Sequence, residues 1–294
     1  MTVIGIFGPT ASGKTGVAGA VAARIPAELV SADAMQVYRG LPILTNQAPA
    51  RLVAVWELDH EASVGEYALL AHAAIDEILA AGRTPLVVGG TGLYLRAALS
   101  ELELPPPPGP GVRARWEAVY DADPAAAHRR LRQRDPAAAA AVHQNDRRRV
   151  VRALELAEAG ASLAPGRDRL WAGETRRPTL LVGLDVPRDV LERRILERTH
   201  AMFAAGVENE VRRALAGPVS TTARKTLGLD EVASLGRDAA VEAIAARTRR
   251  YASYQRKWMR RAPGLVIVDG DRPPGEIADD IVALAGTRER LPRR

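Results

Sequence analysis

The sequence predicts an α/β protein, with a parallel-sheet core that has helices on both faces and an all-helical insertion domain. Short, continuous apolar runs recur along the chain, and segments with helical spacing of apolar residues separate them. Such runs are typical of parallel strands that are covered on both faces. In addition, residues 112–160 contain no strand-like run, which places the helical insert there.

The first hundred residues predict three strand–helix repeats. Val3–Phe7 is a β-branched and aromatic run that ends at Gly8, which is typical of a buried strand. Ser63 and Glu66 have the spacing of a capping box, which predicts the start of a helix. Apolar spacing predicts further strands at Ala27–Val30 and Pro85–Val88, and helices at Thr15–Ile25, Tyr67–Ala81 and Thr91–Leu99.

A proline-rich segment, Pro105–Pro110, follows these repeats. No helix or strand interior tolerates such a run, so it predicts a stiff linker and a domain boundary. Beyond it, the pairs Asp123-Pro124 and Asp135-Pro136 are each typical of an N-cap followed by a first-turn proline. Asn145 is expected to open one more helix of the insert.

Strand character returns at Thr179–Asp185 and at Leu265–Asp269, with helices between them. The tail Thr287–Arg294 is expected to be frayed. We therefore predict a core made of residues 1–111 and 178–294, which carries a phosphate-loop motif, and a helical insert of residues 112–177.

Composition excludes several classes of protein. The 294 residues are 47% apolar and 26% charged, as in ordinary globular proteins. Cysteine is absent, which rules out disulfide scaffolds, cysteine–zinc sites, iron–sulfur clusters and cysteine nucleophiles. Without an apolar run of 18 residues or a basic leader, the expectation is a cytoplasmic protein with no membrane contact. We also expect a monomer.

The balance of charge is basic, with a formal net charge of +6 and a pI near 10.0. Such a balance favours a polyanionic partner such as a nucleic acid. All but three of the 41 basic residues are arginine, and a GC-rich genome is an alternative source of that bias. The positions of the arginines therefore have to decide between the two explanations.

The segment GPTASGKT at 8–15 matches the phosphate-loop pattern, with a strand before it and a helix after it. Backbone N–H groups of the loop would bind a di- or triphosphate, Lys14 would neutralise it, and the Thr15 hydroxyl would bind Mg²⁺. The alternative is a glycine-rich turn with an incidental lysine. The predicted diphosphate-binding residues are Gly8, Thr10, Ala11, Ser12, Gly13, Lys14 and Thr15.

Two further strands end in polar segments, SADAMQVYRG at 31–40 and GGTGLYL at 89–95. Ligands of open parallel sheets bind at the carboxyl ends of the strands, so Asp33 and Thr91 are expected near the phosphate loop. Asp33 could act as a general base or bind a metal ion. Alternatively, it could only cap the following turn.

Together, these segments resemble the tRNA dimethylallyltransferase (tRNA isopentenyltransferase) family. The resemblance spans nearly the whole chain, in one order, and includes HQNDRRRVVRALEL at 143–156, RTHAMFAAGVENEV at 198–211, TARKTLGLDEV at 222–232 and TRRYASYQRKWMR at 248–260. It implies transfer of a dimethylallyl group from dimethylallyl diphosphate to the exocyclic amine of the adenosine 3′-adjacent to a tRNA anticodon. It also implies Mg²⁺ as cofactor and a phosphate-loop core with a helical insert.

The resemblance also implies roles for individual residues. Asp33 matches the catalytic base, Thr91 the threonine that positions substrate, and Arg198 an arginine at the diphosphate. Lys14 and Thr15 match the diphosphate and Mg²⁺ residues. The segments expected to contact tRNA contain Asp33, Ala34, Met35, Gln36, Arg148, Arg149 and Arg152.

The sequence departs from the family pattern in places that concern tRNA contact. Ala34 stands where the family commonly has serine, and Ile43–Gln47 replaces a Gly-Thr-Ala-Lys segment. Trp56–His60 is shorter than the corresponding His-rich segment, and Ser253-Tyr254 replaces Lys-Arg. The catalytic set is unaffected.

The distribution of charge favours RNA. Residues 112–177 contain 14 arginines and 9 acidic residues, and residues 243–262 contain seven basic and no acidic residues. A solvated face is the alternative for such clusters. Tyr251, Tyr254 and Trp258 share one face of a helix, where they either stack on bases or, more commonly, pack in a core.

Three rival functions share some of these features. A phosphate-loop kinase would require ATP, and an enzyme that prenylates free adenine nucleotides would have no use for a basic insert. A nucleotide-switched RNA-binding protein would not need Asp33 or Thr91 for chemistry. Comparing ATP with dimethylallyl diphosphate as protectants against thermal unfolding separates the first rival from a prenyltransferase.

Overall fold

The computed structural model describes residues 2–101, 109, 111–163 and 175–290. The chain divides into two compact units, Met1–Glu101 with Gly173–Arg294, and Leu102–Ala172. We call the first the core unit and the second the insert unit. Apart from Gly109, the proline-rich segment lies outside the described residues.

Five parallel strands form the sheet of the core unit, in the order β2-β3-β1-β4-β5. This arrangement confirms the predicted parallel α/β core, and each predicted strand is present to within one residue at either end. The strands are β1 (Val3–Phe7), β2 (Ala27–Ser31), β3 (Thr84–Gly89), β4 (Thr179–Asp185) and β5 (Val266–Asp269).

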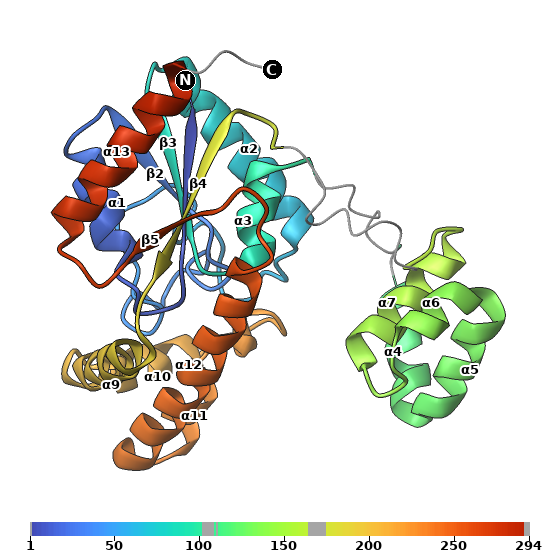
Figure 1. The fold of residues 1–294 in the computed structure, drawn as a ribbon. Coiled ribbons are helices and arrows are strands. Elements are labelled where there is room, and N and C mark those ends of the chain that lie inside the picture. The colour runs from blue at the N-terminus through green and yellow to red at the C-terminus, as the bar shows by residue number, and fades with distance from the viewer. Residues whose placement is uncertain (1, 102–108, 110, 164–174, 291–294) are drawn as a thin grey trace. The chain divides into compact units, whose positions relative to one another are not determined.

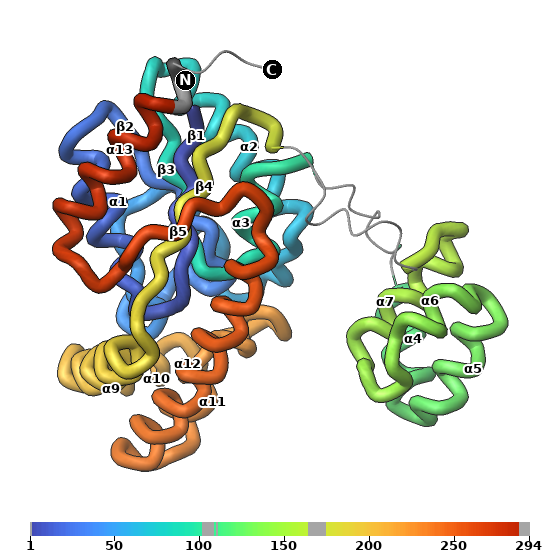
Figure 2. Tube along the Cα trace, in the orientation of Figure 1, coloured from blue at the N-terminus to red at the C-terminus, as the bar shows by residue number. Residues whose placement is uncertain are grey.

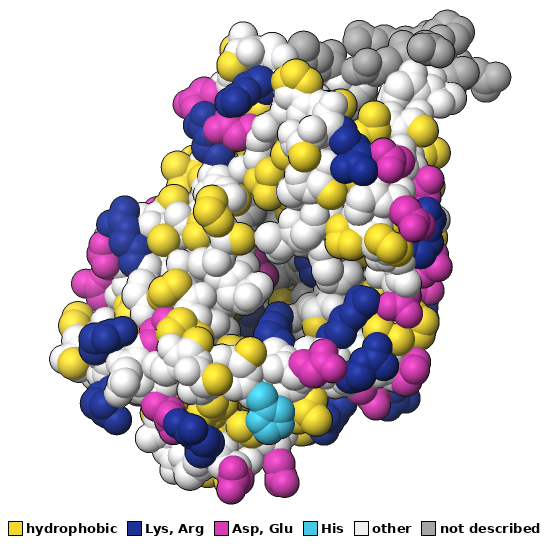
Figure 3. All heavy atoms as spheres, turned by 90° about the vertical axis from the view of Figure 1, so that its left-hand side faces the viewer, with side chains coloured by type: hydrophobic (Ala, Val, Ile, Leu, Met, Phe, Trp, Pro, Cys, Tyr) yellow, Lys and Arg dark blue, Asp and Glu magenta, His cyan; other side chains and the backbone are white. Residues whose placement is uncertain are grey.

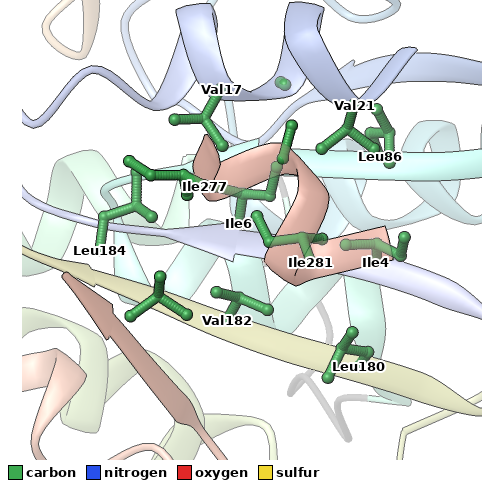
Figure 4. Close-up of a cluster of buried hydrophobic side chains, with 13 residues drawn as sticks. Ile4, Ile6, Val17, Val21, Leu86, Leu180, Val182, Leu184, Ile277 and Ile281 are labelled. Atoms are coloured by element: carbon green, nitrogen blue, oxygen red, sulfur yellow. The ribbon is translucent and has the colours of Figure 1, made fainter. Parts of the chain in front are cut away.

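Helices cover both faces of the sheet, as predicted (Figures 1 and 2). One face is covered by α1 (Lys14–Ala22) and α13 (Pro274–Arg290), and the other by α2 (Val64–Ala80) and α3 (Gly92–Leu99). Figure 4 shows the core beneath α1 and α13, where apolar side chains of the sheet and the two helices interlock. Burial of this apolar surface holds the sheet and the helices together.

Two predicted helix ends were wrong. The helix predicted over Thr15–Ile25 ends at Ala22, because Pro26 disfavours helical backbone at the residue before it. Of the tail Thr287–Arg294 that was predicted to fray, the part up to Arg290 continues helix α13, and residues 291–294 lie outside the described residues. Thr287 contributes there by donating its hydroxyl to the Ala283 carbonyl at 3.0 Å.

Further helices gather at the end of the sheet toward which the strands point (Figure 1). A separate apolar cluster joins these helices to the segment after β2. Its members include Leu41 and Leu44 from that segment and Phe203, Leu229 and Ile244 from the helices. The elements are α9 (Arg188–Ala204), α10 (Val207–Ala214), the 3₁₀ turn η1 (Ala223–Lys225), α11 (Leu229–Ser234) and α12 (Arg237–Met259).

The insert unit is helical in its described residues, with α4 (Val112–Ala122), α5 (Pro124–Arg134), α6 (Pro136–Ala141) and α7 (Arg147–Glu158) around a core of its own. The Asp123 and Asp135 side chains cap α5 and α6, as predicted. Asn145 was predicted to open the next helix, α7. The structure shows that the N-cap is instead the next residue, Asp146, whose side chain accepts the Arg149 N–H. Within the described ranges, no helix is long and apolar enough to cross a membrane.

Candidate active site

The loops that follow β1, β2 and β3 meet at the carboxyl end of the sheet. A Cβ atom built on Gly89 would lie 2.3 Å from the carbonyl oxygen of Ala32, and one built on Gly90 would lie 2.9 Å from that of Gly8. Only glycine fits at such distances. The two glycines therefore bring the three predicted site segments into direct backbone contact.

The phosphate loop leads straight into α1. Gly13 precedes the helix with φ +86°, and Ala11 has φ +62°, which a residue with a side chain rarely adopts. The first N–H groups of a helix have no partner within it and carry the positive end of its dipole. The Ser12 hydroxyl is buried without a hydrogen-bond partner among the described residues. These groups make the loop suited to an anion.

Two half-buried cations stand beside one carboxylate at this loop. The Lys14 Nζ donates to the Pro9 carbonyl at 2.6 Å. Burial lowers the pKa of Lys14 to about 8. The negative charge of Asp33 opposes this shift, and the positive charge of Arg198 adds to it. Burial likewise lowers the pKa of Arg198, which interacts electrostatically with Asp33. Both cations are desolvated, so the site favours a bound anion.

Asp33 caps its own turn, because its Oδ1 accepts the Met35 N–H at 2.9 Å. The capping bond of the alternative interpretation is thus present, and it accounts for one of the two carboxylate oxygens. The negative charge of Asp33 also reaches the phenols around it. Burial and then Asp33 raise the pKa of Tyr251 to about 12, while burial, Tyr94 and Asp33 raise that of Tyr67.

Thr91 stands at the start of α3, where its side chain makes no capping bond. Its Oγ1 is instead 2.9 Å from the hydroxyl of Tyr251, on α12. Next to it, the Tyr67 hydroxyl donates to the Ser31 carbonyl at 2.9 Å, and its ring lies 4.6 Å from that of Tyr94. The surroundings of Thr91 therefore contain a hydroxyl pair and two packed tyrosine rings in addition to the charged groups.

The sequence analysis left the aromatic residues of α12 as one stripe, and the structure separates them. Tyr251 points to Thr91, whereas Trp258 packs on Gly92, where an added Cβ would lie 2.3 Å from the indole ring. Tyr254 is 55% exposed. Tyr251 and Gln255 are site residues that the sequence analysis did not assign. Their spacing of four residues, which puts them on one helix face, was the available signal.

Among the residues expected to contact tRNA, Gln36 and Met35 are engaged inside the core unit. The Gln36 Oε1 accepts the Ser31 hydroxyl at 2.9 Å, and its Nε2 donates to two carbonyls of the following turn. The Met35 sulfur accepts the Thr226 hydroxyl at 3.2 Å. Both side chains hold the loop that carries Asp33 in place.

The three predicted arginines of the insert unit lie on α7 in different surroundings. Arg152 pairs with the buried Glu155 at 2.9 Å, and Arg149 pairs with Asp146 at 3.6 Å. Arg148 is exposed, and among the described residues it forms no ion pair. Arg148 is thus the member of the set whose charge is free for a partner.

The space-filling view in Figure 3 shows a face that is hollowed near its middle, with Lys or Arg side chains inside the hollow. Within the described residues, no group of three or more His, Cys, Asp or Glu side chains could hold a metal ion.

Comparison with known proteins places this geometry in a family. The family model described as IPP transferase matches residues 36–262. The chain is 38% identical to a tRNA dimethylallyltransferase of Thermobifida fusca, over 96% of this chain and 94% of the relative. It is 39% identical to one of Salinispora arenicola, over 96% and 86%.

Comparison with solved structures finds enzymes of the same kind. The full-length tRNA isopentenylpyrophosphate transferase of Bacillus halodurans is 30% identical, with a TM-score of 0.71 over 98% of this chain and 97% of that one. The Staphylococcus epidermidis enzyme of the same kind is 26% identical, with a TM-score of 0.70. The resemblance inferred from the motifs is thus confirmed, and the chain belongs to the IPP transferase family.

Proposed function

We propose that this protein transfers a dimethylallyl group from dimethylallyl diphosphate to the exocyclic amine of the adenosine that is 3′-adjacent to the anticodon in tRNA. The names of the curated relatives support the activity. One observation carries the assignment of the site: two desolvated cations, Lys14 and Arg198, face one carboxylate, Asp33, at a phosphate loop.

The donor diphosphate would bind at the loop. N–H groups at the start of α1, the Ser12 hydroxyl and the two cations all favour its negative charge. The bond from the allylic carbon to the diphosphate oxygen breaks during transfer, so negative charge grows on the leaving group. Lys14 and Arg198 would stabilise the leaving group more strongly in the transition state, where its negative charge is larger, than in the bound donor. This difference lowers the barrier to transfer.

Magnesium would bind at this site together with the diphosphate. The exposed Thr15 hydroxyl at the start of α1 is the protein oxygen at hand, and Mg²⁺ commonly binds through substrate phosphates and waters with few protein ligands. When bound, Mg²⁺ would supply further neutralisation of the diphosphate charge.

Asp33 would act on the acceptor. The adenine amine is a weak nucleophile because its lone pair is delocalised into the ring. As its nitrogen bonds to the allylic carbon, one N–H proton passes to a carboxylate oxygen of Asp33, and diphosphate departs. General-base assistance of this kind contributes roughly 10²–10⁴-fold. The Thr91 and Tyr251 hydroxyls, which lie 2.9 Å apart, would orient the acceptor.

Mass spectrometry of tRNA nucleosides tests the proposal. After incubation with the full chain, Mg²⁺ and dimethylallyl diphosphate, we expect prenylated adenosine in tRNA and stoichiometric release of diphosphate. ATP in place of the donor is expected to give no product. Unmodified tRNA under these conditions, or prenylation of free AMP in preference to tRNA, would contradict the proposal.

A further inference from the structure

Gln255 of α12 connects distant parts of the active site. It is only 2% exposed, and its Oε1 accepts the N–H of Thr10 in the phosphate loop at 2.8 Å. Its Nε2 lies so close to Gly90 that an added Cβ would be 2.3 Å away. One buried amide thus contacts the loop after β1 and the loop after β3.

Gln255 is also connected, through Tyr251, to Thr91 on the proposed acceptor side of the site. The Tyr251 phenol, one helical turn before Gln255, interacts electrostatically with the Gln255 amide, and the phenol oxygen lies 2.9 Å from the Thr91 Oγ1. Glutamine can fill this place because its amide offers an acceptor and a donor at once. A series of polar contacts through Gln255 and Tyr251 therefore runs from the phosphate loop to Thr91.

The same helix supports the loop at its strained point. Ala11, which follows Thr10 and has φ +62°, packs against an apolar cluster formed by Ile195 of α9 with Ala245 and Ala252 of α12. A residue in this conformation is held there only by its surroundings. The Gln255 bond to the Thr10 N–H and the packing on Ala11 fix two consecutive residues of the loop.

We propose that Gln255 is a positioning residue that holds the phosphate loop in its diphosphate-binding conformation, and that Tyr251 extends this control to Thr91. The inference rests on the proposed donor site. Binding groups have to be held to within about 0.5 Å before the ligand arrives if they are to be effective. Gln255 holds the phosphate loop in place for the donor, and Tyr251 holds Thr91 in place for the acceptor.

Two substitutions separate the two roles. Gln255→Met keeps the volume of the side chain but leaves the Thr10 N–H without its acceptor. An unsatisfied buried donor of this kind is expected to weaken binding of inorganic diphosphate with Mg²⁺ by about tenfold. Tyr251→Phe removes only the hydroxyl, so diphosphate affinity should stay within about twofold while kcat for prenyl transfer falls by about tenfold.

Calorimetric titration of the full chain with diphosphate and Mg²⁺, without tRNA, measures the first effect, and single-turnover prenyl transfer measures the second. Gln255→Asn, which is one methylene too short to reach Thr10, repeats the test if the Met variant does not fold. Thr248→Val is the matched control, because Thr248 is also on α12 and also 2% exposed; neither quantity should change.

Wild-type diphosphate affinity in both Gln255 variants would overturn the positioning role, and so would a lower Tm without a change in affinity. Simultaneous, equal loss of affinity and kcat in Tyr251→Phe would overturn the division between the two residues. A wild-type chain that binds no diphosphate contradicts the proposed donor site itself, and the inference then falls with it.

Discussion

The core unit and the insert unit use their cationic side chains in different ways. In the core unit, Lys14 and Arg198 are half-buried around Asp33, and within the described residues neither forms an ion pair. In the insert unit, Arg147 holds Asp121 with a two-pronged ion pair at 2.7 Å. These two cations at the phosphate loop are thus left without a paired carboxylate in the described residues, whereas much of the positive charge in the described part of the insert unit is neutralised internally.

A count of arginines therefore overstates how much of the insert unit is available to RNA. The buried Glu155 receives both Arg113 and Arg152, and Arg115 is paired with Glu158. Proximity in sequence indicates only the Arg152–Glu155 pair, at i,i+3, because Arg113 and Arg115 lie on α4 and their carboxylates lie on α7. Whether an arginine is available to RNA depends on which carboxylates the fold brings next to it. The following experiments test the difference between the unpaired charges of the core site and the paired charges of the insert unit.

The largest effect is expected at Asp33. Asp33→Asn keeps the size of the side chain and an oxygen for the Met35 N–H, but removes the base. Single-turnover prenyl transfer should slow by roughly 10²–10⁴-fold, whereas donor and tRNA affinity should change little. If Asp33 instead mainly holds Mg²⁺, excess Mg²⁺ would restore the rate, and such recovery would reject the base role.

The next effect concerns the anchoring carboxylate of the insert unit. Two arginines counter the rise that burial causes and lower the pKa of Glu155. Glu155→Gln should destabilise the helices around it by about 2 kcal/mol, because bonds to charged groups are lost. Amide hydrogen exchange of α7 in the full chain measures this.

The exposed Glu158 provides the control: Glu158→Gln should have a smaller effect on exchange. The stabilisation by Glu155 is present above its ordinary pKa of 4.5 and is lost as the pH falls through the lowered value. Equal exchange rates in both variants would show that the paired arginines do not stabilise the insert unit.

Much of the fold could be predicted from the sequence, because apolar runs, glycines and caps act locally. The strand at Val3–Phe7 and the cap at Asp123 are examples. The meeting of three loops also followed from a general property of parallel sheets. Gln255 could not be found in this way, since its bond to Thr10 spans 245 residues. The pairing of Arg113 with Glu155 could not be predicted, because it joins residues 42 positions apart through the packing of α4 on α7, whereas Arg152 pairs with the same carboxylate within α7.

The third effect is the pH dependence of donor binding. With a pKa of about 8 in the free protein, Lys14 is mostly charged at pH 7 and mostly neutral at pH 9. Diphosphate affinity should therefore fall by about tenfold between these pH values. Lys14→Arg, which stays charged, corrects for ionisation of the ligand itself. Parallel pH profiles for the two proteins would show that Lys14 does not titrate in this range.

The smallest effect compares two neighbouring arginines of α7. Arg147 and Arg148 are both exposed, but Arg147 is held by Asp121, whereas Arg148 has no ion pair among the described residues. Arg148→Ala should reduce the salt dependence of tRNA binding by about 0.7–0.9 in logarithmic slope, the value for one phosphate contact. Arg147→Ala should leave the slope unchanged, because its charge is already neutralised. Arg149→Ala should fall between them, since its pairing with Asp146 is loose at 3.6 Å. Equal slopes for the wild type and Arg148→Ala would mean that Arg148 only faces solvent.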